Sequence, residues 1–525
     1  MKGRLTRILG LLLCIIVMSS VVSGCSSSNM SVGSNTLKIL LVGSKPAGFD
    51  DVVARFEELT ADTLNIKLHV EWVASGDMKD TLKLRMNTGE EYDLVFDAPF
   101  YNLRTLAAAG VYQPLESYFN NDEYPGLKKS FEEDVIKANY YYGHLYSIPM
   151  MRTYGSGIPC VYYRQDLADK YGIGQITTEE QLQAYFEAIL ANEPDMTPLG
   201  VTNTRGFYTM FPIDEVGMAK VNLVKLSAAN LTWYIQTNET NTAVESIAYE
   251  GAPQSDFDNF PAPYNTTDLY GDALNKRHEW NKYLEQDSIS QKDSLGGMAG
   301  EKFAAHIDTL DAYENVAAKM TRDYMKLGVY VYPEAAQRME PEARVTTLMA
   351  NNFVCVPISS SKVDLTMKFL DWLFSSEENH DLFELGIEGE DWEPVGEDQY
   401  RVIQGETAAQ TYTFPGYVLT WNPNYVKFPD TLPDDILAYK KYDLEKDAYY
   451  VSPLAGFNFD VTPVTTEAQI VKETADKVTN SLAHGTLDDP VTKIQENRAA
   501  VIEHINVIKD ELERQINEFL ANKDF

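Results

Sequence analysis

The sequence predicts an α/β fold, and three observations indicate this class. Residues 36–42, 65–73 and 93–96 have the apolar patterns of strands, whereas residues 49–56 and 78–86 repeat apolar side chains at helical spacing. The two kinds of segment alternate along the chain, and this order is typical of a parallel sheet with right-handed crossovers. The length of 525 residues suits two or three domains, and the 44% hydrophobic content is enough for well-filled cores.

The same order of elements returns in two later runs. The first run is expected to contain a strand at 161–163, a helix at 179–190 that begins after Thr177 and Thr178, and a strand at 198–201. The second run is expected to contain a strand at 353–357 and helices at 363–374 and 377–385.

Two further segments are distinguished by composition and by periodicity. Residues 238–267 are rich in Asn, Thr, Gly and Pro, which predicts loops. Residues 491–520 carry an apolar stripe at helical spacing. We expect this C-terminal helix to pack on its own domain, although a coiled coil that binds a partner is an alternative.

The N-terminus has the pattern of an export signal that ends at a cysteine. Positive residues precede an apolar stretch from Ile8 to Val22, and Val22-Ser23-Gly24-Cys25 resembles the lipobox of bacterial lipoproteins. The resemblance implies a signal peptide at 1–24, lipidation of Cys25, a flexible tether at 25–35 and a location at the extracellular face of the cell membrane. An ordinary secretory signal with a chance cysteine is the alternative.

The charge of the chain argues against several partners. It has 44 Lys and Arg against 78 Asp and Glu, a formal net charge of −34, so the body as a whole repels nucleic acid and anionic lipid. No second apolar run approaches the roughly 18 residues that cross a membrane. The acyl group on Cys25 is therefore the only anchor that we expect.

Cysteines and enzyme motifs offer little chemistry. Cys160 and Cys355 lie in apolar runs and are expected to be buried. The sequence does not decide whether they form a disulfide with each other. Neither a nucleophile elbow nor a zinc-binding helix is present, and the glycines at 43–48 lack the lysine of a phosphate loop. We therefore expect no cofactor and no metal, although a pair of glycosidase carboxylates cannot be found or excluded by spacing.

The sequence does contain the residues of a binding site. In an open parallel sheet, ligands bind beyond the carboxyl ends of the strands. Here those ends are residues 43–48, which include Ser44 and Lys45, and residues 97–101, which begin with Asp97. The chain has 32 tyrosines and six tryptophans, and an aromatic ring offers an apolar face to the C–H groups of a sugar. Most of these rings are expected to be structural, so their number alone is weak evidence for a sugar ligand.

Several segments resemble family 1 extracellular solute-binding proteins. Residues 143–149, 161–173, 177–182 and 369–375 are similar to segments of that family, although Thr178 stands where the family usually has Trp. The segments at 386–392, 414–417 and 453–459 resemble a lipoprotein subgroup of Gram-positive sugar importers that ends in a domain of unknown function. The resemblance covers residues 36–525. It depends on the order and spacing of these segments together, and not on any single motif.

This resemblance implies a type II periplasmic-binding-protein fold, with two lobes, a hinge and a ligand cleft between the lobes. The expected lobes are 36–150 with 353–415, and 151–352 with 416–525. The expected crossings lie near 149–154, 351–353 and 412–419.

The resemblance implies a monomeric, non-catalytic lipoprotein of an ABC importer. We expect it to capture a carbohydrate, in particular an oligosaccharide, and to deliver it to permease subunits in the membrane. A surface-anchored glycoside hydrolase or lyase, and a sugar-sensing binding protein, are the alternatives.

The predicted site combines aromatic rings with a few polar groups. Trp421 or Tyr154 is expected to stack on a pyranose, Asp97 and Asn422 are expected to bind its hydroxyls, and Trp233 is a further stacking candidate. Ser44 and Lys45 complete the set as ligand-binding candidates from the first strand end.

Overall fold

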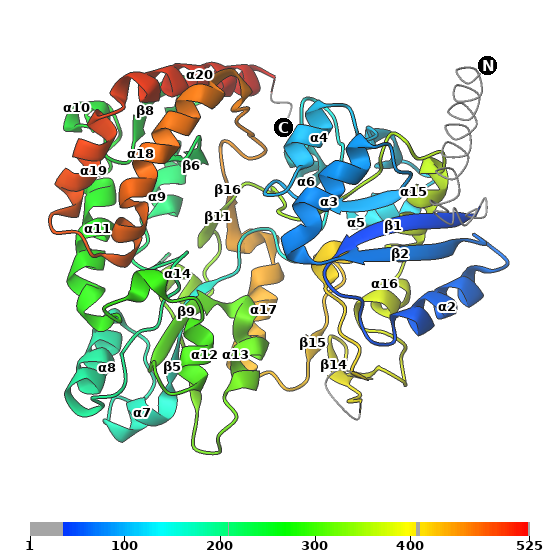
Figure 1. Cartoon of the computed structure of the whole chain (residues 1–525), viewed down its shortest axis with the longest axis horizontal. Coiled ribbons are helices and arrows are strands. Elements are labelled where there is room, and N and C mark those ends of the chain that lie inside the picture. Colours follow the sequence, from blue (N-terminus) through cyan, green and yellow to red (C-terminus); the bar gives the residue numbers. More distant parts are fainter. Residues whose placement is uncertain (1–34, 208, 406–409, 523–525) are drawn as a thin grey trace, which may run out of the picture.

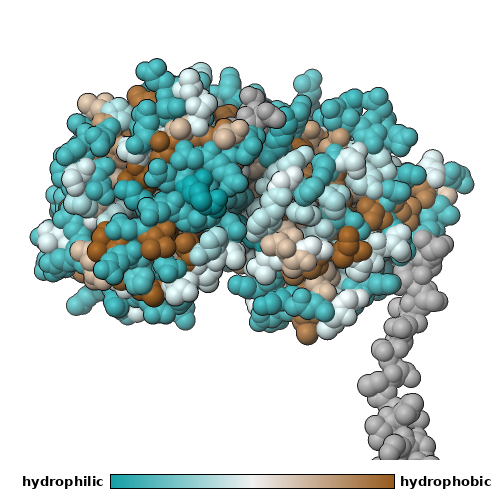
Figure 2. Space-filling model, turned by 90° about the horizontal axis from the view of Figure 1, so that it is seen from above, coloured by the Kyte–Doolittle hydropathy of each residue, from teal (hydrophilic) through white to brown (hydrophobic). Residues whose placement is uncertain are grey.

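Two lobes lie side by side in the structure, a computed structural model that describes residues 35–207, 209–405 and 410–522 (Figure 1). The first lobe is built around one large hydrophobic core, and the second lobe contains three smaller cores. Seen from above, the two bodies have a hollow between them (Figure 2). Cys25, the predicted signal peptide and the tether up to residue 34 lie outside the described residues.

A five-stranded sheet forms the centre of the first lobe, in the order β2-β1-β3-β12-β4. Its strands are β1 (Thr36–Val42), β2 (Lys67–Val73), β3 (Leu94–Asp97), β4 (Ile148–Pro149) and β12 (Phe353–Cys355). β1 pairs in parallel with β2 and β3, which confirms the predicted parallel sheet, whereas β12 runs antiparallel to β3 and β4. β1 lies inside the sheet between β2 and β3, and most of its apolar side chains are fully buried.

Helices cover both faces of this sheet (Figure 1). The predicted helices are present as α2 (Phe49–Thr60), α3 (Ser75–Asn87), α15 (Val363–Leu373) and α16 (Glu377–Glu384), and α4 (Leu103–Ala108), α5 (Pro125–Ser130) and α6 (Glu133–Ala138) complete the lobe. α2 shows why these segments are helical, since Phe49, Val52 and Phe56 recur at helical spacing and all three are buried.

One half of the second lobe, here called the β5 half, contains the sheet β10-β5-β9. Its strands are β5 (Pro159–Arg164), β9 (Ala305–Thr309) and β10 (Leu327–Val331), and its helices are α7 (Gln165–Lys170), α8 (Glu179–Asn192), α12 (Ser294–Ala299), α13 (Tyr313–Lys319) and α14 (Glu334–Gln337). Both strand pairs are antiparallel, so the parallel arrangement predicted for this run is wrong. The strand predicted at 198–201 is reduced to isolated bridges, because Leu199 and Gly200 pair with two different segments.

The other half of the second lobe, here called the β7 half, is a hairpin sheet covered by long helices. It contains β6 (Leu223–Ala228), β7 (Leu231–Thr237), β8 (Val244–Tyr249), α9 (Glu215–Lys220), α10 (Gln254–Phe257), α11 (Asp268–Trp280), α18 (Thr465–His484), α19 (Pro490–Ala499) and α20 (Ile502–Ala521). β8 and α10 lie within the segment predicted as loops, because Ile247, Tyr249 and Phe257 join this core. The apolar stripe of α20 packs against α18 and β8, as expected for a helix on its own domain.

The remaining elements lie near the junction of the lobes or at the edge of the first lobe. They are α17 (Asp434–Leu444), β11 (Arg344–Thr346), β16 (Tyr449–Val451), β13 (Trp392–Val395), β14 (Gln399–Val402) and β15 (Phe428–Pro429). β11 and β16 pair in parallel and form a two-stranded sheet of their own. Among the described residues, no helix is long and apolar enough to cross a membrane.

Five connections join the lobes, at residues 154–158, 343–348, 425–428, 444–448 and 449–454, as the core memberships on either side of each segment show. The first begins where the expected segment 149–154 ends. The second precedes the expected 351–353, because Leu348, Ala350 and Phe353 belong to the first core. The third differs from the expected 412–419, because Tyr412, Phe414 and Leu419 are buried in the first core. An apolar run can belong either to a connection between the lobes or to a core. The sequence pattern of residues 412–419 did not distinguish these two possibilities.

Cys160 and Cys355 are both free and fully buried. Cys160 belongs to a core of the second lobe and Cys355 to the core of the first lobe. This arrangement resolves the open question of their pairing, since each thiol is enclosed in a different core. Burial raises the pKa of both thiols well above the ordinary value.

Candidate ligand-binding cleft

A cleft of about 1250 Å³ lies between the first lobe and the β7 half of the second lobe. Pro99 and Arg104 line it from the first lobe, and residues 224–232 line it from β6, β7 and their turn. Its floor is built from residues 150–153, 155–157, 345–347 and 349–352, in and next to the first two connections. Both lobes and the segments that join them thus contribute to one cavity, and its shape depends on the angle between the lobes.

The first wall begins at the carboxyl end of β3, where binding was expected. Asp97 ends this strand, but its side chain is fully buried and faces away from the cleft lining. Its carboxylate accepts hydrogen bonds from the Tyr112 hydroxyl at 2.7 Å and from the backbone N–H groups of Ala98 at 2.7 Å and Asn102 at 3.1 Å. Burial raises the pKa of Asp97 to about 6, and these hydrogen bonds oppose the rise. Asp97 shapes the loop that carries Pro99 and α4.

The opposite wall is the tip of the β6–β7 hairpin. Ala229 and Asn230 form its two-residue turn with left-handed φ angles of 48° and 65°, as a type I′ hairpin requires. Trp233 supports the turn, because its indole N–H donates to the Ala228 carbonyl at 2.9 Å. Its side chain is fully buried in the core of the β7 half, so the structure places Trp233 behind the wall and not in the cleft.

Trp421 is the predicted aromatic residue that lines the cleft. Its side chain is half-buried, its ring lies edge-on to Tyr417 at 6.0 Å, and its carbonyl accepts a hydrogen bond from the Met151 amide at 3.2 Å. Gly416 makes this position possible, because a Cβ atom there would lie 2.5 Å from the indole. Trp421 therefore lies on the cleft floor next to the first connection.

The other predicted residues lie outside the cleft lining. Asn422 is buried and its amide donates to the Ser130 carbonyl at 2.8 Å. Tyr154 is also buried, and its hydroxyl donates to Glu132 at 2.5 Å. Ser44 and Lys45 lie on an exposed loop, where Lys45 forms an ion pair with Asp50. The structure brings Trp421, Asn422 and Tyr154 to the same side of the first lobe, but only Trp421 contacts the cavity.

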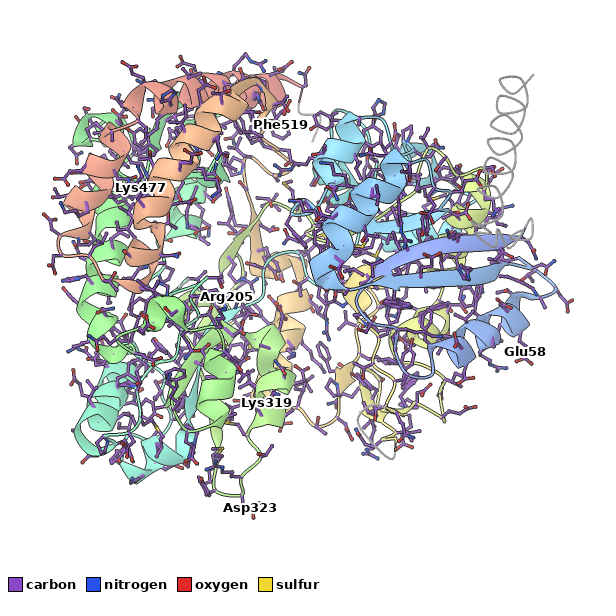
Figure 3. All side chains as sticks on the ribbon, viewed as in Figure 1. Glu58, Arg205, Lys319, Asp323, Lys477 and Phe519 are labelled. Atoms are coloured by element: carbon purple, nitrogen blue, oxygen red, sulfur yellow. The ribbon has the colours of Figure 1, made fainter. Side chains whose placement is uncertain are left out.

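Several residues of the lining were not predicted. A strap at residues 452–461 follows β16 and contributes Phe457, Asn458 and Phe459. Phe457 packs edge-on against Phe519 of α20 at 5.5 Å, and Phe519 is labelled in Figure 3. Two arginines, Arg104 and Arg152, also line the cavity. Residues 453–459 were noted for their family resemblance, which was the available signal for the strap, whereas no motif marked the arginines.

Arg344 ties three of the connections together at the base of the cleft. Its guanidinium donates to the Asp443 carboxylate, to the Ser156 carbonyl and to the Tyr449 hydroxyl at 3.1 Å. It also lies over the Tyr449 ring at 4.7 Å. Gly155 permits this packing, because a Cβ atom there would lie 2.6 Å from Tyr449. The side chains that join the lobes here are charged and buried.

Within residues 35–207, 209–405 and 410–522, no group of three or more His, Cys, Asp or Glu side chains could hold a metal ion. The cleft itself offers aromatic rings, amides and charged groups for non-covalent binding.

Comparison with known proteins places the chain among binding proteins. Residues 52–388 match the family described as bacterial extracellular solute-binding protein, and residues 453–521 match a domain of unknown function. A protein of Streptococcus pneumoniae serotype 4, named "Carbohydrate ABC transporter substrate-binding protein", is 22% identical over 498 residues, which cover 93% of this chain and 91% of the relative.

Solved structures share the two-lobed fold. The N-glycan transport solute-binding protein of Streptococcus pneumoniae has a TM-score of 0.68 at 18% identity, with 94% of this chain and 100% of that chain covered. The same protein has also been solved with Man5GlcNAc, and that structure has a TM-score of 0.60 at 19% identity, with the same coverage. A solute-binding protein from Bifidobacterium longum infantis that binds HMO has a TM-score of 0.59 at 14% identity, with 94% and 100% covered.

Proposed function

This chain belongs to the bacterial extracellular solute-binding protein family, and we propose that it is the membrane-anchored lipoprotein of an ABC importer that captures a carbohydrate. In this role it delivers the carbohydrate to permease subunits in the membrane. The observation that carries the proposal is the interlobe cleft of about 1250 Å³ with Trp421 on its floor. Sites for small molecules are typically about 300–1,000 Å³, so this size favours an oligosaccharide.

The lining suits a sugar chain. Trp421 offers an apolar face for a pyranose ring, and polar side chains of both lobes, among them Asn230, Asn352 and Thr347, offer donors and acceptors for hydroxyls. The relatives agree with this choice, since one is named for carbohydrate transport and another was solved with Man5GlcNAc.

The five connections allow the lobes to close on a ligand. A ligand shifts such an open–closed equilibrium only by its differential affinity for the two states, and contacts from both walls supply that difference. Catalysis is not needed for capture and delivery, and we propose that the chain is not an enzyme. Lipidation of Cys25 would hold the monomer at the extracellular face of the cell membrane.

The test is a calorimetric titration of the purified chain with a panel of neutral and acidic oligosaccharides. Saturable binding with a thermal shift supports the proposal, because a ligand at 100 times its Kd adds about 2.7 kcal/mol to the free energy of unfolding. Release of reducing sugar from the same panel would instead indicate a hydrolase. Absence of binding to every sugar tested would contradict the proposed function.

A further inference from the structure

The lining of the cleft has a charge balance opposite to that of the protein as a whole. The chain carries 44 Lys and Arg against 78 Asp and Glu. The charged residues of the lining are four cations and two carboxylates, namely Arg104, Arg152, Lys225, Arg498, Glu250 and Asp311. A cleft with low-dielectric walls focuses such a local field, so it can attract an anion into an acidic protein.

Two of these cations already have partners in the protein. Lys225 forms an ion pair with Glu215 at 2.6 Å. Arg498 is buried, and it donates to the backbone carbonyl of Glu250 at 3.3 Å and to the Asn497 side chain at 2.7 Å. These two residues serve the structure of the β7 half.

The other two cations, Arg104 and Arg152, form no ion pair with any carboxylate of the described residues. Arginines elsewhere on the described surface do, for example Arg205 with Asp308 at 2.9 Å and Arg401 with Asp430 at 2.7 Å. Arg104 and Arg152 therefore line one cavity without a carboxylate partner, in a chain that has 78 Asp and Glu.

The positions of the two arginines suit a ligand that reaches from the wall to the floor. Arg104 lies on α4 in the first wall, exposed and beside the Tyr141 hydroxyl. Arg152 is half-buried on the floor, with its guanidinium over the Phe428 ring at 5.9 Å, and it follows Met151, whose amide binds Trp421.

The carboxylates of the lining do not neutralise this pair. Asp311 and Arg152 both border a small side pocket next to the cleft, and among the described ion pairs none joins them within 4 Å. Glu250 lies with Arg498 in the β7 half. A neutral ligand would leave both guanidinium groups dehydrated and without a counter-charge when the lobes close, which costs free energy.

We propose that the carbohydrate bound in this cleft carries a carboxylate, as oligosaccharides with uronic or sialic acid do, and that Arg104 and Arg152 bind that group. The planar guanidinium matches a carboxylate with two parallel hydrogen bonds, which a sugar hydroxyl cannot accept in the same way. This inference rests on the proposed function and adds the charge class of the substrate.

The experiment compares acidic and neutral sugars of equal length by calorimetry. Trigalacturonate is paired with galactotriose, and sialyllactose with galactosyllactose. We expect at least one acidic member to bind at least about tenfold more tightly than its neutral partner, a difference of about 1.4 kcal/mol. High salt should weaken the binding of the acidic sugar more than that of the neutral one.

Variants assign the preference to the two arginines. Arg104→Gln and Arg152→Gln are each expected to reduce the acidic preference several-fold, with the melting temperature as a check on folding. Arg338→Gln is the matched control, because Arg338 is exposed and forms ion pairs with Glu334 and Glu340 away from the cleft.

Tight binding of a neutral sugar without an acidic preference would overturn this inference and leave the proposed function standing. The same holds if both glutamine variants weaken neutral and acidic sugars equally. If no sugar binds, the proposed function fails and the inference fails with it.

Discussion

Replacing Arg344 with methionine tests how the lobes are held together. The Arg344 side chain is 11% exposed and that of Asp443 is 6% exposed, so their ion pair is largely removed from water. In the Arg344→Met variant the Asp443 carboxylate keeps only the Tyr449 hydroxyl, which donates at 2.6 Å, and the Ser156 carbonyl loses its guanidinium donor.

Breaking a buried ion pair by removing one partner costs about 3–5 kcal/mol, because the remaining charge is left without compensation. The lost stacking on Tyr449 at 4.7 Å adds about 0.5–2 kcal/mol. We therefore expect Arg344→Met to lower the free energy of unfolding by about 3.5–7 kcal/mol. The double variant Arg344→Met/Asp443→Leu should lose much less, because no buried charge is left unpaired.

Urea denaturation measures both variants, with the midpoint and the slope recorded for each. Arg338→Met is the control, since its exposed ion pairs contribute at most about 1 kcal/mol. A loss below about 1 kcal/mol for Arg344→Met would refute the role of this ion pair, and so would a double variant that is less stable than the single one.

Four further outcomes are expected. Trp421→Ala should weaken oligosaccharide binding by about 1–3 kcal/mol in calorimetry, because the apolar face on the cleft floor is lost, and an unchanged affinity would remove Trp421 from the site. Cys25→Ala should release the protein into the medium without unfolding it, and membrane retention of this variant in fractionation would contradict the lipid anchor. Burial raises the pKa of Asp97 to about 6, so the contribution of this carboxyl group to the free energy of unfolding should fall by about 3 kcal/mol as the pH rises from about 4 to above 6. In thermal unfolding, Asp97→Asn should lack this part of the pH dependence. Small-angle scattering should give a smaller radius of gyration at saturation with a tightly binding sugar, and an identical profile would count against closure of the lobes.

The local sequence pattern was sufficient to predict an element when the signal for it lies within the element itself. β1 is a strand over the predicted residues 36–42, and α8 begins at Glu179 after Thr178, whose side chain and that of Gln181 form a capping box. In both cases the signal lies within a few residues, so no knowledge of distant contacts is needed.

Long-range contacts explain the predictions that failed. Residues 198–201 have the composition of a strand, but their backbone partners come from two separate segments, so no ladder forms. Residues 244–249 lie in a polar region and still form β8, because β7 offers a partner strand and α20 covers it. Tertiary context overrides local propensity at such positions.

The candidate site shows the same division. Trp421 was predicted from its place after the crossing expected at 412–419, and it lines the cleft although that crossing lies elsewhere. Trp233, an equally good candidate in sequence, supports the hairpin from inside the core. Arg104, Arg152 and the strap at 452–461 come from segments far apart in the chain and meet only in the cleft. Proximity in space has no signature in a single sequence.

The sequence by itself determined the α/β class, most helices and strands of the first lobe, and the acidic character of the body, because each depends on composition or on local periodicity. Only the tertiary structure decided where the third connection runs, that Cys160 and Cys355 lie in different cores, and which side chains face the cleft. These features depend on the packing of segments hundreds of residues apart, and the free energy of that packing is a property of the whole fold.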